Sequence, residues 1–156
     1  MISDKVNDAL NGQMKAELYS SYLYLSMSSY FHSTGMHGAA SWMRVQAGEE
    51  LVHSMKFFDY LAANGRAIMQ PVEAPPSSWG SALDVFQNVY DHERKVTALI
   101  KGLVEVAVQE NDPGTKNFLQ WYVDEQVEEE ESSGSVLQKA KASGSDRVAL
   151  QSLDKE

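Results

Sequence analysis

The sequence predicts an all-α protein, a bundle of four long helices with one long crossover and a short fifth helix near the C-terminus. Four segments of the 156-residue chain carry apolar or small residues three and four positions apart, the spacing of one helix face. Short breaks at residues 33–38 and 111–113 join these segments in antiparallel pairs. Residues 65–80 hold three of the four prolines and provide the crossover. This length suits a single domain over residues 1–156.

The first helix is expected from about Asp4 to His32. Its stripe contains one carboxylate, Glu17, among apolar and small residues. Apolar residues also occur around more of the circumference than one core explains, so we expect subunit contacts to cover the remainder. The stripe consists of Leu10, Met14, Ser21, Tyr24, Ser28 and Phe31.

The second helix is expected from about Ala39 to Asn64, and Gly65 ends it. Polar groups interrupt its core stripe as well. Gly48 lies inside this helix and is roughly 1 kcal/mol less favourable there than alanine, so local rigidity is expected to suffer. The stripe consists of Met43, Gln46, Glu50, His53, Phe57 and Tyr60.

The third helix is expected to open at Ser81, which with Asp84 three positions later resembles a capping box. Asp112 then serves as N-cap and Pro113 as first residue of a fourth helix that runs to about Ala142, with Gly134 inside it. A short fifth helix is expected near residues 147–153. The third stripe consists of Phe86, Val89, Tyr90, Glu93, Val96, Ile100, Leu103 and Ala107, and the fourth of Phe118, Tyr122, Gln126, Glu129, Ser133, Val136 and Ala140.

The composition excludes several classes of function. The chain has no cysteine, so disulfides, iron–sulfur clusters and thiol catalysis are excluded, and any metal site must use oxygen and imidazole ligands. A formal net charge of -9 repels nucleic acids and anionic membranes and attracts cations. The start of the chain lacks the features of a secretory signal and no stretch resembles a membrane span, so we expect a cytoplasmic protein without nucleic-acid or membrane partners.

All four predicted stripes carry polar groups at mid-helix, and this coincidence is the strongest functional signal. An unpaired buried carboxylate costs several kcal/mol, so four converging carboxylates would oppose folding unless cations neutralise them. Glu50 and His53 are three positions apart, which places a carboxylate and an imidazole side by side on one helix face. The polar groups are Glu17, Glu50 with His53, Glu93, and Gln126 with Glu129.

This set matches the ligand pattern of di-iron carboxylate bundles, in which two helices give single glutamates and two give Glu-x-x-His. The fourth helix departs from it, because Gln126 and Glu129 stand where a symmetric site has glutamate and histidine. We therefore expect a lopsided site. One ion takes Glu17, Glu50 and His53. The other shares Glu50, binds Glu93 firmly and meets Gln126 or Glu129 weakly. Iron suits these ligands, and so do manganese and zinc.

The chain resembles the prokaryotic non-haem ferritins over almost its whole length. The resemblance rests on the motifs Ala16-Glu17-Leu18-Tyr19, Gly38 to Met43, Glu49 to His53, Pro75 to Trp79 and Asn117 to Glu130. It implies a ferroxidase centre of two irons per subunit at Glu17, Glu50, His53, Glu93 and Gln126, with Glu129 nearby and Tyr24 within reach.

The resemblance also implies an accessory iron site of Glu49, Glu125, Glu128 and Glu129, and a homo-oligomeric shell of twenty-four subunits. The implied function is iron storage, in which ferrous ions are oxidised by dioxygen or hydrogen peroxide and deposited as ferric oxyhydroxide. Nothing indicates a haem ligand.

Two other functions compete with iron storage. A di-iron oxidoreductase, such as a peroxidase of the rubrerythrin kind, would use the same bundle without a mineral, but the missing cysteines argue against its iron–thiolate domain. A DNA-protecting shell with metal sites between subunits is opposed by the complete intrasubunit ligand set and the acidic charge. His32, His37 and His92 are expected to be exposed residues, and a redox role for Tyr24 is a hypothesis that Tyr24→Phe tests.

Overall fold

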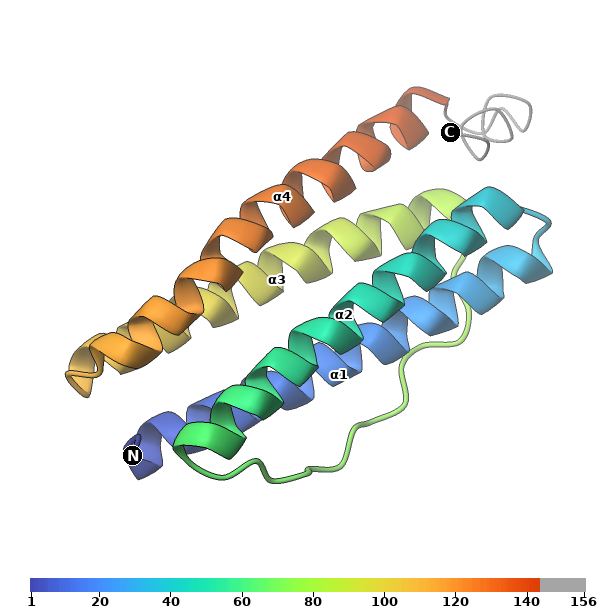
Figure 1. Cartoon of the computed structure of the whole chain (residues 1–156). Helices are drawn as coiled ribbons and strands as arrows, with labels where there is room; N and C mark the ends of the chain where they lie inside the picture. The colour runs from blue at the N-terminus through green and yellow to red at the C-terminus, as the bar shows by residue number, and fades with distance from the viewer. Residues whose placement is uncertain (144–156) are drawn as a thin grey trace.

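The computed structural model contains four long helices and describes residues 1–143. They are α1 (Asp4–Ser33), α2 (His37–Asn64), α3 (Ala82–Gln109) and α4 (Pro113–Ser143). Figure 1 shows α1 and α2 as one antiparallel hairpin, and α3 and α4 as a second hairpin lying along it. The predicted all-α four-helix bundle is therefore confirmed, with helix bounds within two residues of those expected. The expected fifth helix near residues 147–153 lies outside the described residues.

Short polar side chains fix where the helices begin. The Ser81 hydroxyl accepts a hydrogen bond from the backbone N–H of Asp84 at 3.2 Å, as its position predicts. An Asp112 carboxylate oxygen accepts one from the backbone N–H of Thr115 at 3.0 Å, and Pro113 occupies the first helical position. These caps satisfy N–H groups that have no partner inside the helix. They confirm the predicted starts of α3 and α4.

The crossover from α2 to α3 runs along the outside of the bundle from one end to the other (Figure 1). Two asparagines of α1 tie down its beginning. The Asn7 side chain accepts from the backbone N–H of Arg66 at 2.8 Å, and the Asn11 side chain accepts from the backbone N–H of Ile68 at 2.7 Å. The crossover is thus an ordered part of the fold that crosses the outer surface of α1.

Two apolar clusters fill the bundle at different heights. The first, near the α1–α2 turn, is here called the turn cluster and comprises Leu23, Tyr24, Met27, Phe31, Ala39, Ala40, Met43, Ala47, Val85, Phe86, Val89, Leu137 and Ala140. The second, toward the start of α1, is here called the N-terminal cluster and comprises Val6, Leu10, Met14, Phe57, Leu61, Val96, Ile100, Leu103, Ala107, Leu119 and Tyr122. The buried charged residues lie between these two clusters along every helix.

The buried stripes of α2 and α4 differ from the predicted ones by single positions. Leu119 and Leu137 are buried on α4, whereas the predicted Phe118 and Val136 are only half-buried. The same occurs on α2, where Ala47 and Leu61 replace Gln46 and Tyr60. Neighbouring positions differ by only about 100° around a helix, so a sequence stripe with spacings of three and four allows either choice.

The two glycines inside helices have different surroundings, and both helices continue through them without interruption. A Cβ at Gly48 would meet nothing within 4 Å. A Cβ at Gly134 would lie 3.2 Å from Cε1 of Tyr90, closer than most side-chain contacts. Gly134 therefore allows the Tyr90 ring of α3 to pack closely on α4. The helices are thus continuous at both glycines, and reduced rigidity there stays a prediction.

Candidate metal centre

Glu17 from α1 enters the layer between the two apolar clusters and is 1% exposed. Its Oε1 accepts a hydrogen bond from Nε2 of Gln13, one helical turn earlier, at 3.1 Å. Its other oxygen, Oε2, is buried and has no hydrogen-bond partner. A buried carboxylate oxygen without a donor is costly, so it marks a place where a cation would be stabilised.

Glu50 and His53 face Glu17 from α2, side by side as their spacing predicts. Nδ1 of His53 lies 3.3 Å from Oε2 of Glu50, an oxygen that has no partner of hydrogen-bond geometry. The hydroxyl of Tyr122 donates to the backbone carbonyl of His53 at 2.6 Å and braces this turn of the helix. Ligand atoms of Glu17, Glu50 and His53 all lie within 4.8 Å of one another, which is close enough to hold one ion.

Glu93 from α3 and Glu129 from α4 complete a second triad with Glu50. Their ligand atoms also lie within 4.8 Å of one another, and all three residues are buried. Glu50 belongs to both triads, so two ions would share it. Within residues 1–143 these are the two clusters of three or more potential ligands that the structure contains.

Gln126 and Tyr24 act on Glu93 as hydrogen-bond donors. The Tyr24 hydroxyl donates to Oε1 of Glu93, and Nε2 of Gln126 lies 3.2 Å from Oε2 of the same carboxylate. The Gln126 amide also lies 3.1 Å from Oγ1 of Thr97. Gln126 is thus turned toward the carboxylate as a donor, while Glu129 supplies the oxygen of the second triad. Coordination of an ion by Gln126 remains a prediction.

Burial raises the pKa of all four carboxyls above the usual range. The pKa of Glu50 and that of Glu129 each rise to about 8, first through desolvation and then through neighbouring carboxylates. Burial also raises the pKa of Glu17 well above its usual value, with further raising by Glu50. Burial also raises the pKa of Glu93, and hydrogen bonds from Tyr24 and Gln126, which favour its charged form, oppose this rise. Divalent cations would relieve this repulsion, so the donor set fits a pair of such ions.

The structure brings the four glutamates of the expected accessory iron site only partly together. Glu129 is buried and joins the second triad, whereas Glu49 and Glu128 are exposed. Glu125 is half-buried, with Oε1 at 4.0 Å from Nε2 of His53. These residues lie on the surfaces of α2 and α4 next to the centre. An accessory ion there remains a prediction.

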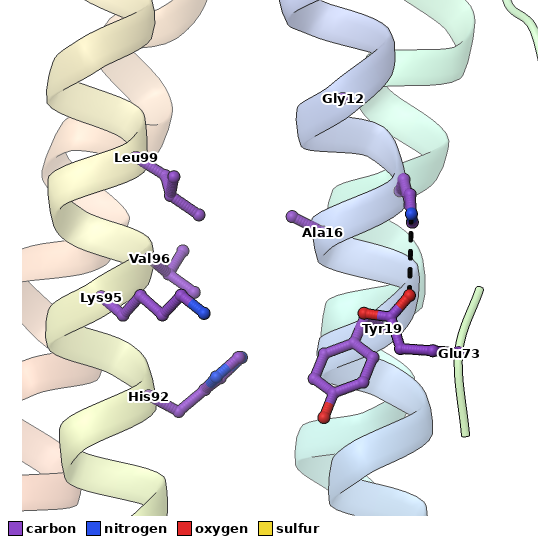
Figure 2. Close-up of a pocket in the computed structure, with 9 residues that line it drawn as sticks. Gly12, Ala16, Tyr19, Glu73, His92, Lys95, Val96 and Leu99 are labelled. Carbon is purple, nitrogen blue, oxygen red and sulfur yellow. Dashed lines mark ion pairs between the residues drawn. The ribbon is translucent and has the colours of Figure 1, made fainter. Parts of the chain in front are cut away.

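His92 is half-buried, which corrects the expectation of an exposed residue. Its Nε2 lies 2.8 Å from Oγ of Ser20, and its ring meets the edge of Tyr24 at a centroid distance of 5.8 Å. Burial lowers the pKa of His92 to about 4, with a smaller lowering by Lys95. His92 lines a cavity of about 280 Å³. Figure 2 shows its imidazole projecting from α3 toward α1. Sequence periodicity missed this position because His92 lies beside the main stripe of α3.

Two further residues near the centre were missed in the sequence. Gln13 holds Glu17, and its position four residues earlier on the same helix is the signal that could have revealed it. Thr97 donates to the carboxylate of Glu130 at 2.8 Å while it contacts Gln126. Thr97 lies four residues after Glu93 on α3, the corresponding signal.

Among the described helices, none combines the length and apolar character that crossing a lipid bilayer requires.

A model of the ferritin-like domain matches residues 7–143. A bacterial non-heme ferritin of Bacteroides fragilis is 43% identical over 145 residues, which cover 92% of this chain and 91% of that protein. One from Escherichia coli is 39% identical over 157 residues, covering 100% and 95%.

The fold comparison agrees with the sequence comparison. An open pore ferritin from the archaeon Archaeoglobus fulgidus superimposes with a TM-score of 0.98 at 54% sequence identity, covering 99% of this chain and 96% of that one. The likeness therefore extends over the four helices, the crossover and the layer that carries the two carboxylate triads. The chain belongs to the ferritin family.

Proposed function

We propose that this protein stores iron and oxidises it at a ferroxidase centre formed by Glu17, Glu50, His53, Glu93 and Glu129. The observation that carries the proposal is the pair of overlapping triads, which share Glu50 at mid-bundle. Two orphaned oxygens, on Glu17 and Glu50, support it, because both belong to the first triad. Membership in the ferritin family makes iron the expected cargo. The proposed setting is the cytoplasm.

Ferrous ions are the substrate of the proposed reaction, with two bound per subunit. Each ion gives one electron to dioxygen, which with two protons becomes hydrogen peroxide. The ferric ions then hydrolyse, release protons and join a ferric oxyhydroxide mineral. The chain's own contribution is to hold both ions in the charged layer between the two apolar clusters, where carboxylates balance the charges of the ions.

The residues divide this work unequally. Glu17 and His53 serve the first ion and Glu50 bridges the two. Glu93 and Glu129 serve the second ion. Tyr24 and Gln126 orient Glu93 through its two oxygens, which supports a positioning role for both. A single imidazole, on the first side only, leaves the second ion with oxygen ligands alone, consistent with its release after oxidation.

An accessory iron site next to the centre is part of the proposal. Glu49, Glu125 and Glu128 lie toward solvent while Glu129 faces inward, so the four residues connect the centre to the surface. Their mutual repulsion favours a cation. We propose that ferric ions leave by this route.

Assembly into a hollow homo-oligomeric shell of twenty-four subunits is the remaining element. Large apolar side chains stay exposed on the neighbouring helices α1 and α2 of the isolated chain, and a subunit contact would remove them from water. These residues are Tyr22, Leu25, Leu51, Val52, Met55 and Phe58.

Aerobic loading tests the whole proposal. The protein is mixed with ferrous salt, and the iron that co-elutes with it in size-exclusion chromatography is measured against its mass. Storage predicts hundreds of irons on a large assembly. About two irons per chain would instead indicate a di-iron oxidoreductase of the rubrerythrin kind, and none would indicate a scaffold. Glu50→Ala is the matched control, because it removes the shared ligand and leaves the exposed surface unchanged.

A further inference from the structure

The turn between α1 and α2 brings two exposed histidines together, far along the bundle from the carboxylate centre. His32 lies in the last turn of α1 and His37 is the first residue of α2. Their Nδ1 atoms are 3.3 Å apart, with ring centroids at 5.5 Å. Both side chains are exposed, so an ion from solvent can reach them.

The turn holds the backbone positions of the two histidines. The backbone N–H of Thr34 and that of Met36 both donate to the carbonyl of Phe31, at 3.2 and 3.0 Å. Gly35 adopts a φ of 82°, in the left-handed region that favours glycine. Because these bonds close the chain reversal, the two imidazoles start from backbone positions that are held relative to each other.

The nitrogen separation matches the requirement of a shared metal ion. Nitrogens bound at the usual 2.0–2.1 Å from a tetrahedral zinc ion lie about 3.3–3.4 Å apart. The end of α1 favours a cation and the start of α2 disfavours one, so the helix dipoles nearly cancel. The type of ligand therefore decides which cation binds. Paired neutral imidazoles suit zinc, copper and nickel.

We propose that His32 and His37 form a surface site for a borderline divalent cation, with water completing the coordination. Affinity should follow the general order for nitrogen ligands, in which Cu(II) binds most tightly and Mn(II) and Fe(II) most weakly. The site is therefore distinct in metal preference from the carboxylate centre. It does not depend on the proposed iron chemistry.

Copper titration of the full chain tests the site. Calorimetry and electron paramagnetic resonance compare the unaltered protein with the double variant His32→Ala/His37→Ala. The carboxylate centre is the same in both, so the difference isolates the turn. We expect the unaltered protein to bind about one more Cu(II) per chain, with hyperfine splitting from two nitrogens, and either single variant to bind at least ten-fold more weakly. Equal uptake by the unaltered protein and the double variant overturns the proposal and leaves a hydrogen bond between two imidazoles.

A second control tests whether Cu(II) binding needs the spacing of the two histidines or only the presence of two histidines at the turn. His32→Ala combined with Ser33→His keeps two imidazoles at the turn but moves one of them about 100° around α1. We expect this variant to bind Cu(II) as weakly as the single variant His32→Ala. Binding equal to that of the unaltered protein would mean that spacing is irrelevant, and would also overturn the proposal.

Discussion

The apolar clusters at the two ends of the bundle and the charged layer between them are built on opposite principles. In the N-terminal cluster, Phe57 stacks on Tyr122 with ring centroids 4.2 Å apart, and both rings are buried. In the charged layer, buried oxygens of Glu17 and Glu50 have no donor. Among residues 1–143 the buried side-chain oxygens without a hydrogen-bond partner lie in the charged layer, not in the apolar clusters. Such unsatisfied oxygens fit the cation-binding role proposed for the layer.

The apolar clusters and the charged layer differ most in how their ionisable groups respond to pH. Tyr24 belongs to the turn cluster, and burial together with the charge of Glu93 raises its pKa well above the usual value, so it stays a neutral donor. Burial, followed by the neighbouring carboxylates, raises the pKa of Glu129 to about 8. The end clusters should therefore set stability at every pH, and the layer should add a dependence on pH and metal.

Truncating a stacked ring in the N-terminal cluster should have the largest effect. Phe57→Ala removes a fully buried side chain and leaves a cavity, so we expect a loss of about 3–5 kcal/mol in the free energy of unfolding. Denaturant unfolding measures it. Val108→Ala, at an exposed position of α3, should change stability by less than about 0.5 kcal/mol. Similar losses in the two variants would remove the distinction between core and surface on which the comparison rests.

Removing the shared carboxylate should affect activity and spare the fold. We expect Glu50→Ala to slow rapid ferrous oxidation on the order of 100-fold, because both ions lose a ligand. Gln126→Ala should slow it less, since Gln126 orients Glu93 from one side only. Stopped-flow absorbance with dioxygen measures both rates. Equal rates in the two variants would contradict the lopsided centre.

The charged layer should make metal-free protein less stable as pH rises. A carboxyl whose pKa is raised in the folded state contributes stability below its unfolded pKa, and this contribution is lost as pH rises toward about 8. Glu129→Gln should therefore raise stability by about 1–2 kcal/mol at pH 8 and leave it unchanged near pH 4. Calorimetry of chelator-treated protein measures this. If the stability of the unaltered protein and that of Glu129→Gln changed with pH in parallel, Glu129 would not be the source of the pH-dependent loss.

The two helical glycines offer the smallest effect. Gly48→Ala should stabilise α2 by about 0.5–1 kcal/mol, because a methyl group there meets open space. Gly134→Ala should gain less or lose stability, because its methyl group would press on Tyr90. Melting temperatures of the two variants provide the measurement. A larger gain at Gly134 would mean that the Tyr90 ring moves aside freely.

The sequence predicted the helices and crossover well because their signals are local. Ser81 and Asp112 accept hydrogen bonds from backbone N–H groups three positions away, Gly65 ends α2, and the three crossover prolines exclude regular helix between α2 and α3. The choice between neighbouring stripe residues, such as Phe118 and Leu119, depends on the partner helix and could not be read from one helix alone.

The candidate centre divides in the same way. Glu50 and His53 are paired by helix geometry, so their contact followed from spacing. The turn of the Gln126 amide toward Glu93 depends on a neighbour 33 residues away, and the burial of His92 depends on Ser20, 72 residues away. Such contacts have no signature within one helical turn, so only the structure reveals them.

The two triads draw differently on the two hairpins. Glu17, Glu50 and His53 all come from α1 and α2, whereas the second triad joins Glu50 to Glu93 and Glu129 on the opposite hairpin. A slight separation of the hairpins would leave the first triad intact and pull the second one apart. If the proposed iron centre forms, such a separation would therefore weaken the second ion's site before the first, so the contact between the two hairpins would control how firmly the second ion is held.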